Sequence, residues 1–203
     1  MQFSVSEEIF EKFPAARIGV VVASGIDNTG SDDEIQRLLE NIQTQTKIRF
    51  DTETLAEHPS IAVWRDAYAS FGSKPRDFRS SIEALVRSVL NGRGVRHINK
   101  LVDIYNYTSL KHAIPVGGED LDKTSGNLYL KFSDGHERFI PLGSDKEDNP
   151  YAGEEYMMQG DRLDFLSGAD HRCVPGAEIQ CRRVAPRCLA DPVFECRRVA
   201  AAL

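Results

Sequence analysis

A short basic stretch, "FGSKPRDFRSS" over residues 71–81, carries the side chains best suited to bind an anion. The residues concerned precede or open a predicted helix and are Lys74, Arg76, Arg79, Ser80 and Ser81. Exposed amides at a helix N-terminus and guanidinium groups both bind phosphate or carboxylate, so the stretch predicts an anion site. The alternative is a capped helix whose charges are solvated or joined in salt bridges.

A second stretch, "AIPVGGEDLD" over residues 113–122, combines two glycines with three carboxylates. Counted from Asp120, an EF-hand loop needs glycine at its sixth position and glutamate at its twelfth, where this chain has Ser125 and Lys131. Calcium binding of that type is therefore excluded. The stretch predicts a turn that starts the next element, with its acids held by local hydrogen bonds.

Several well-known catalytic and ligand-binding motifs are missing from the sequence. It contains no glycine-rich phosphate loop, no zinc-protease histidine pair and no serine-nucleophile elbow. The histidines have no metal-ligand spacing, and each is predicted to be structural or exposed: His58, His97, His112, His136 and His171. The four cysteines contain no C-x-x-C pair. We predict no metal and no cofactor, and the residues alone assign no catalytic group.

Charge is unevenly distributed along the 203 residues. Residues 171–203 hold six arginines and three acids, a balance of +3, so the net charge of −6 leaves −9 on the first 170 residues. This balance argues against DNA and non-specific nucleic-acid binding but leaves room for a local basic patch. No apolar run approaches the roughly 18 residues that span a membrane, and the N-terminus does not resemble a secretion signal. We expect a cytoplasmic protein.

Hydrophobic periodicity predicts the elements that must position these residues. It indicates a buried strand over 16–23 and a helix that opens with Ser31 and Glu34 as a capping box. Further helices are predicted over 60–71, 80–91 and 98–110, and Ser80 and Glu83 form a capping box at the start of the helix over 80–91. Alternation then predicts a strand over 127–132 paired with 137–143 across a turn. One strand, a helical middle and further strands indicate an α+β fold.

The segment "RHINKLVDIYNYTSL" resembles R-P-I-N-x-x-V-D-x-T-N-Y of the phenylalanyl-tRNA synthetase β subunit, in its B3/B4 editing region. The matching residues are Arg96, Ile98, Asn99, Val102, Asp103, Asn106 and Tyr107. Stand-alone relatives carry W-x-x-A-Y-x-x-F-G-x-K-P, R-S-S-x-E-A-L and P-x-G-G-x-D-L-D, which are similar to segments beginning at Trp64, Arg79 and Pro115. The resemblance covers roughly residues 10–154.

The resemblance implies one B3/B4-like domain over residues 1–160, followed by an irregular Arg- and Cys-containing tail over 161–203. In stand-alone relatives the chain ends in a strand resembling L-C-R-R-W-N-W-R, and "QCRRVAPRC" lacks both tryptophans. The tail is interpreted as a loosely ordered extension or an Arg-rich nucleic-acid arm, with a diverged or a frame-shifted ending.

The implied function is binding of aminoacyl-tRNA, with ester hydrolysis in trans, because the synthetase domain removes tyrosine wrongly attached to phenylalanine-specific tRNA. The implied partners are tRNA or aminoacyl-tRNA, or a free amino acid, and neither a membrane nor DNA. The alternative is a non-catalytic module that binds an amino acid, a small molecule or a protein. Nothing resembles an aminoacylation domain, so ligase activity is not implied.

The ligand-binding residues that the resemblance adds are Tyr105, Asn106, Gly117, Gly118, Asp120 and Glu137. Tyr105 replaces a threonine of the pattern, and Gly117 stands where the synthetase has histidine. A loop without that imidazole offers no side chain there to orient water. We therefore expect tyrosine attached to phenylalanine-specific tRNA to be hydrolysed slowly or undetectably. Asp120 or Glu137 is the expected partner of the α-ammonium group.

Overall fold

The protein combines five α-helices with two small sheets among the residues that the computed structural model describes. These residues are 2–70, 72, 74, 76, 78–122, 126–136, 152, 155–159 and 198–202, the last two segments as backbone. In chain order the elements are β1 (Phe3–Val5), α1 (Glu7–Lys12), β2 (Val20–Ser24), α2 (Asp33–Arg49), a 3-10 turn (Leu55–Glu57), α3 (Pro59–Ser70), α4 (Ser81–Leu90), α5 (Lys100–His112), β3 (Gly117–Asp120), β4 (Leu128–Phe132), β5 (Glu155–Gln159) and β6 (Arg198–Ala202). The α+β fold class predicted from the sequence is confirmed.

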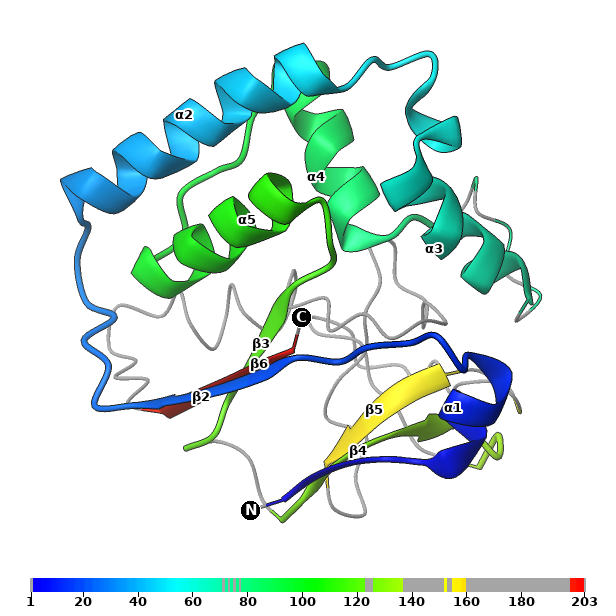
Figure 1. The fold of residues 1–203 in the computed structure, drawn as a ribbon. Helices are drawn as coiled ribbons and strands as arrows, with labels where there is room; N and C mark the ends of the chain where they lie inside the picture. Colours follow the sequence, from blue (N-terminus) through cyan, green and yellow to red (C-terminus); the bar gives the residue numbers. More distant parts are fainter. Residues whose placement is uncertain are drawn as a thin grey trace.

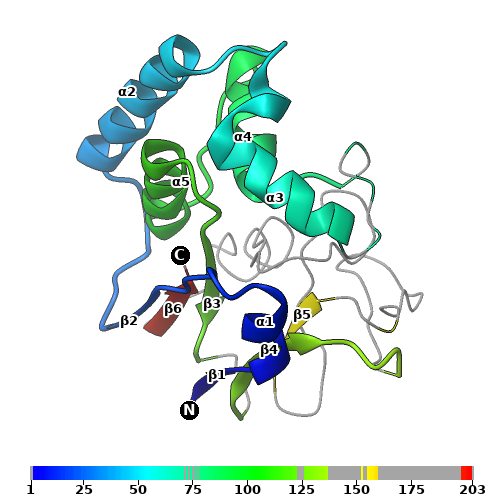
Figure 2. The same ribbon diagram turned by 45° about the vertical axis from the view of Figure 1, so that its right-hand side comes forward.

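The two sheets have three strands each. In one, β6 lies between β2 and β3 and is antiparallel to both. In the other, β4 lies between a parallel β1 and an antiparallel β5. Helices α2, α4 and α5 lie together on one side of the β2–β6–β3 sheet, whereas α1 packs beside β4 (Figures 1 and 2). The helical layer therefore lies over the β2–β6–β3 sheet, and α1 lies beside the other sheet.

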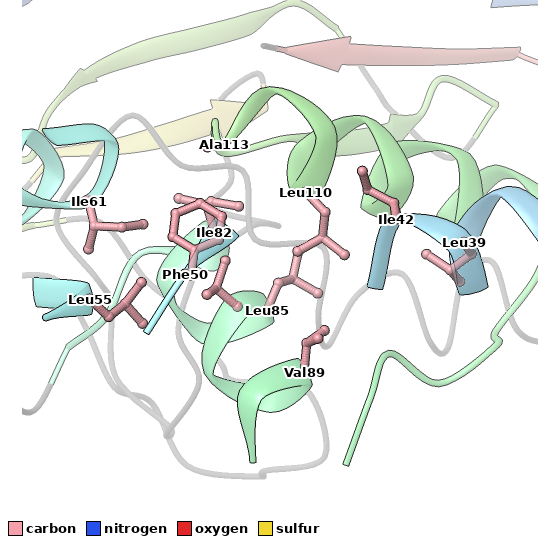
Figure 3. Close-up of a cluster of buried hydrophobic side chains, with 11 residues drawn as sticks. Leu39, Ile42, Phe50, Leu55, Ile61, Ile82, Leu85, Val89, Leu110 and Ala113 are labelled. Carbon is pink, nitrogen blue, oxygen red and sulfur yellow. The ribbon is translucent and has the colours of Figure 1, made fainter. Parts of the chain in front are cut away.

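The main hydrophobic core lies within the helical layer (Figure 3). Helix α4 supplies buried side chains at the i, i+3, i+4 and i+7 spacing of one helical face: Ile82, Leu85, Val86 and Val89. Its partners come from α2, the 3-10 turn, α3 and α5: Leu39, Ile42, Phe50, Leu55, Ile61, Leu110 and Ala113. Burying one such side chain contributes about 1.5–3 kcal/mol, so this face fixes the position of α4.

Helix starts follow the predicted chemistry in one case and differ in another. Ser80 is the N-cap of α4, as predicted, and its Oγ accepts a hydrogen bond from the Glu83 N–H at 3.3 Å. The predicted cap of α2, Ser31, is wrong, because Asp32 accepts from the N–H groups of Glu34 and Ile35. Aspartate caps as well as serine does, and one Asp32 oxygen reaches both amides.

The first predicted strand is shorter and more exposed than its apolar sequence indicates. The predicted range was 16–23, whereas β2 begins at Val20, and Val22 at its centre is 67% exposed. In the described sheet β2 is an edge strand paired only with β6, and Val20, Val21 and Val22 are all exposed, so neither face of the strand is well covered. Gly25 at φ +68 ends the strand, as predicted.

The glycine stretch is a strand rather than a turn. Gly117–Asp120 form β3, whose residues pair with β6 from Ala202 to Val199. The turn begins only afterwards, where the Asp120 carboxylate accepts a hydrogen bond from the Asp122 N–H at 2.9 Å. The acid is thus held locally, as predicted, but the turn was placed several residues too early.

The predicted strand over 127–132 is confirmed as β4 (Leu128–Phe132). Both edges of β4 are occupied, by β1 and by β5, and the expected partner 137–143 lies outside the described residues. Within the tail expected to be irregular, residues 198–202 form β6. Residues 161–197 lie outside the described part of the chain.

Candidate functional site

Helix α5 and the segment that follows it place the predicted ligand-binding residues. Asn99 caps the helix by accepting a hydrogen bond from the Val102 N–H at 2.9 Å. The helix ends at Ala113, which adopts a left-handed conformation with φ 55. Such a conformation costs alanine about 1–2 kcal/mol. The Ala113 N–H donates to the Ser109 carbonyl and Ser109 Oγ donates to the Ile114 carbonyl, which fixes the turn leading into β3.

Polar and aromatic side chains lie on the buried side of α5. Tyr105 is 9% exposed, so the position that resembles a threonine in the synthetase is filled by a large buried ring. Asn106 is half-buried and lies between Val102 and Leu110 at four-residue spacing, both of which are buried. An amide among apolar neighbours requires hydrogen-bond partners, which makes Asn106 a suitable group for contacting a polar ligand.

The beginning of β3 offers backbone rather than side chains. Gly117 and Gly118 are both buried, and they lie five residues or fewer beyond the end of α5 at Ala113. Without side chains, these residues let another group approach their backbone closely. Asp120 is buried at the far end of the strand with its Oδ1 committed to the turn. Glu137, predicted with this group, lies outside the described residues.

The residues of the predicted anion site lie before and within the first turn of α4. Lys74, Arg76 and Arg79 are exposed. Ser80 is committed to the helix cap, whereas Ser81 is buried and its Oγ has no hydrogen-bond partner among the described residues. Arg79, the capped helix end and a buried hydroxyl thus lie at the first turn of α4, and Lys74 and Arg76 precede them in the sequence.

A buried carboxylate organises the charges around this helix. Glu83 is fully buried, and its carboxylate accepts hydrogen bonds from Arg65 on α3 and Arg87 on α4, each at 2.9 Å. Arg79 Nε lies 4.0 Å from the same carboxylate, while its side chain is 45% exposed. The Glu83 side chain therefore pairs with arginines rather than completing the predicted capping box. Salt bridges, the alternative to anion binding, are present, and Arg79 retains an exposed surface.

One hydrophobic cluster connects the α4 and α5–β3 groups. Ile82 follows Ser81, Ala113 precedes the β3 segment, and Figure 3 shows both side chains in the same core. Because this core is continuous, the first turn of α4 and the entry to β3 are held in a fixed relation. The predicted ligand-binding residues therefore form two groups anchored to a shared support.

The family assignment follows from a comparison with known protein families. The model of the B3/4 domain matches residues 63–164, which is half of the chain and includes both groups of site residues. The chain belongs to the B3/4 domain family. This domain is found in the phenylalanyl-tRNA synthetase β subunit. A search of curated proteins finds no match.

The B3/4 match begins inside α3 and extends through α4, α5, β3, β4 and β5. Helix α2 lies before the matched range but provides Leu39 and Ile42 to the same core. The structural unit that supports the site is therefore larger than the matched segment. Among the described residues, no helix is long and apolar enough to cross a membrane, and no group of acids, histidines and cysteines has the arrangement of a metal site.

Sequence reasoning missed two features of this B3/4 domain. The first is the pairing of Glu83 with Arg65 and Arg87, of which the four-residue spacing from Glu83 to Arg87 was the only local signal. The second is His97, predicted as a structural or exposed histidine, whose Nδ1 lies 2.5 Å from Asp103 Oδ2. No spacing rule identifies that pair, because His97 precedes the helix that carries Asp103.

The loop before α2 adds a further contact to the start of α5. Asn28 is buried and accepts a hydrogen bond from the Leu101 N–H at 3.0 Å. Next to it, hydrogen bonds from the side chain and backbone of Thr29, followed by Lys100, lower the pKa of Asp27 from 3.8 to about 2. Lys100 Nζ lies 3.4 Å from Asp27 Oδ2. These contacts tie the region preceding the family match to the helix that carries Asn106.

Proposed function

We propose that this B3/4 domain binds the aminoacyl end of a charged tRNA and hydrolyses the aminoacyl ester in trans. The observation that carries the proposal is the family match across the helices that hold both groups of candidate residues. In the proposed complex the α5–β3 group contacts the amino acid, and the basic group at the start of α4 contacts the phosphates of the acceptor end.

The chemistry of the α5–β3 group suits an aminoacyl moiety. Asn106 provides an amide that can both donate and accept, and Gly117 and Gly118 allow close approach of the ligand to the backbone. Tyr105 occupies volume that a threonine leaves open, so we propose that it restricts the amino acid side chains that fit. The partner of the α-ammonium group is a carboxylate, and we propose Asp120 or Glu137 for this role.

The basic group suits RNA in spite of the net negative charge of the chain. Lys74, Arg76 and Arg79 are exposed on the segment that leads into α4, beside the arginines gathered at Glu83. Guanidinium groups bind phosphate oxygens through paired, charge-assisted hydrogen bonds, and a local cluster is sufficient where the rest of the surface is acidic. Ser81 Oγ and the first amides of α4 extend this group with neutral donors.

The proposal is tested by measuring the affinity for charged tRNA across a salt titration. Total tRNA charged with each standard amino acid in turn serves as the probe, and uncharged tRNA and the free amino acids serve as references. Binding that requires the charged form and weakens with salt supports the proposal. Binding of free amino acids without any preference for charged tRNA would instead indicate a metabolite-binding module.

The contribution of the basic group is tested with Arg79→Ala against Arg37→Ala. Arg37 is an exposed arginine on α2 that donates to its own helix backbone at Asp33, so its loss removes the same charge elsewhere. One charge-assisted hydrogen bond of about 1.5–3 kcal/mol corresponds to about 10- to 150-fold in affinity. We expect that loss, and a salt slope lower by about 0.7, for Arg79→Ala only. Equal effects of the two substitutions would argue against a specific contact.

A further inference from the structure

We propose that His97 and Asp103 form a base dyad in which His97 activates the water that hydrolyses the aminoacyl ester. The inference rests on the function proposed above and adds to it the group that carries out the chemistry. It also revises the expectation of slow hydrolysis, which considered only the imidazole missing at Gly117. The dyad provides an imidazole from a different segment, between α4 and α5.

The geometry of the pair gives its two members different roles. Asp103 is 1% exposed, whereas the side chain of His97 is 42% exposed. With a carboxylate oxygen 2.5 Å away, Nδ1 is the ring nitrogen that donates the hydrogen bond. The neutral ring therefore carries its lone pair on Nε2, on the side away from Asp103. A buried carboxylate that fixes the tautomer and orientation of an accessible imidazole is the arrangement found in catalytic triads.

The second carboxylate oxygen of Asp103 lies beside the pair. Oδ1 is buried and has no hydrogen-bond partner among the described residues. A buried carboxylate oxygen normally accepts at least one hydrogen bond from protein or water. Oδ1 is therefore a position for a water molecule or a ligand donor beside the dyad.

The dyad lies next to the proposed amino acid site. Asp103 and Asn106 are three residues apart on α5, a spacing that makes side chains neighbours on a helix surface. Among the described contacts, Lys100 at this end of the helix pairs with Asp27 from the loop before α2, and Arg96 precedes His97 in the chain. Asn28 and Asn99 accept hydrogen bonds from the Leu101 and Val102 N–H groups of the first turn, so these two amides are already paired.

The proposed reaction uses one water molecule and no further reactant. His97 Nε2 accepts a proton from water as the water oxygen attacks the ester carbonyl carbon, and a tetrahedral intermediate forms. The bond from that carbon to the ribose oxygen then breaks, and the proton on Nε2 passes to the leaving oxygen. The products are the free amino acid and a tRNA with its terminal hydroxyl restored. Asp103 is a positioning residue, and it stabilises the imidazolium that forms transiently.

The test is a single-turnover deacylation assay with charged tRNA, performed beside the binding measurement on the same samples. His97→Asn retains a donor close to the position of Nδ1 and removes the base at Nε2, and His97→Ala removes both. His112→Asn is the matched control, because His112 is an exposed histidine in the last turn of the same helix. A denaturant titration of each variant records its stability.

We expect His97→Asn to lower the deacylation rate by about 10²- to 10⁴-fold with unchanged affinity for charged tRNA, and His112→Asn to leave both unchanged. The wild-type rate should fall on the acid side of its pH profile, because a protonated imidazole cannot accept a proton, and this limb should vanish in His97→Asn.

Three results overturn the dyad. Wild-type protein that binds charged tRNA but hydrolyses none of the charged forms removes the inference and leaves the binding proposal intact. A His97→Asn rate equal to that of wild type shows that another group provides the base. Absence of both binding and hydrolysis overturns the proposed function together with the dyad.

Discussion

Replacing Glu83 with glutamine removes one fully buried charge and preserves the shape of the side chain. In the wild type this carboxylate accepts from Arg65 Nη1 at 2.9 and 3.1 Å and from Arg87 Nε at 2.9 Å. Glutamine retains one acceptor oxygen, but its NH₂ group faces guanidinium donors that it cannot satisfy. Arg65 and Arg87, each with a side chain 25% exposed, then lose the charge that compensates them.

Removing one partner of a buried ion pair costs about 3–5 kcal/mol. Water reaches both arginines, so the lower end of this range applies, and we expect the free energy of unfolding to fall by about 3 kcal/mol. For a chain of this size, that loss lowers the melting temperature by about 6–12 °C. Glu40→Gln is the matched control, because Glu40 is exposed on α2, and its change should stay within about 0.5 kcal/mol.

The measurement is a urea titration of wild type, Glu83→Gln and Glu40→Gln, with the slope compared to verify that the denatured states are alike. A double-mutant cycle with Arg65→Met then isolates the coupling between α3 and α4. If Glu83→Gln costs less than about 1 kcal/mol, the arginine cluster is screened by solvent and does not hold the two helices together. A large loss without coupling to Arg65 would place the energy in the contact with Arg87 within α4.

Three further predictions concern local parts of the fold. Ser80→Ala removes the N-cap of α4 and should cost about 1 kcal/mol in a thermal or urea titration, whereas Ser80→Asp should be tolerated. The pKa of Asp27 is lowered to about 2, so its contribution to stability is complete above the ordinary value of 3.8 and is lost as the pH falls toward 2; urea midpoints of wild type and Asp27→Asn should therefore converge over that range and differ above it. Deleting residues 198–203 removes the strand between β2 and β3, so amide exchange should accelerate across Val20–Ser24, and unchanged protection there would show that β6 does not support β2.

Much of the helical layer was predictable because its signals are local. The stripe of α4 depends on residues three and four positions apart, and the Ser80 cap depends on an amide three residues later. Such capping and helix-periodic signals depend little on the rest of the chain, although the helix is stabilised only when its apolar face packs against a partner. The motif around Asn99–Tyr107 is also a local signal, because it can be recognised from the order of residues without knowledge of the fold.

Strand pairing was predicted less well because it depends on distant parts of the chain. The described partners of β4 are β1 and β5, and both come from positions far away in the sequence. The apolar run that became β2 reads as a buried strand, and only the order β2–β6–β3 leaves it at an edge of the described sheet. Local composition predicts that a segment forms a strand, but it does not predict the strand's place in the sheet or which of its faces is buried.

For the candidate site, the sequence by itself indicated candidate binding residues: the basic run before α4, the polar positions of α5 and the glycines of β3. The tertiary structure decided which of them meet. Arg65 on α3 and Glu83 on α4 are 18 residues apart and meet only because the fold brings these two side chains together. His97 meets Asp103 because the connection from α4 turns back onto the first turn of α5. Capping and helical stripes arise from the geometry of a single turn, whereas ion pairs and base dyads require side chains from separate segments to be held within hydrogen-bond distance by a common core.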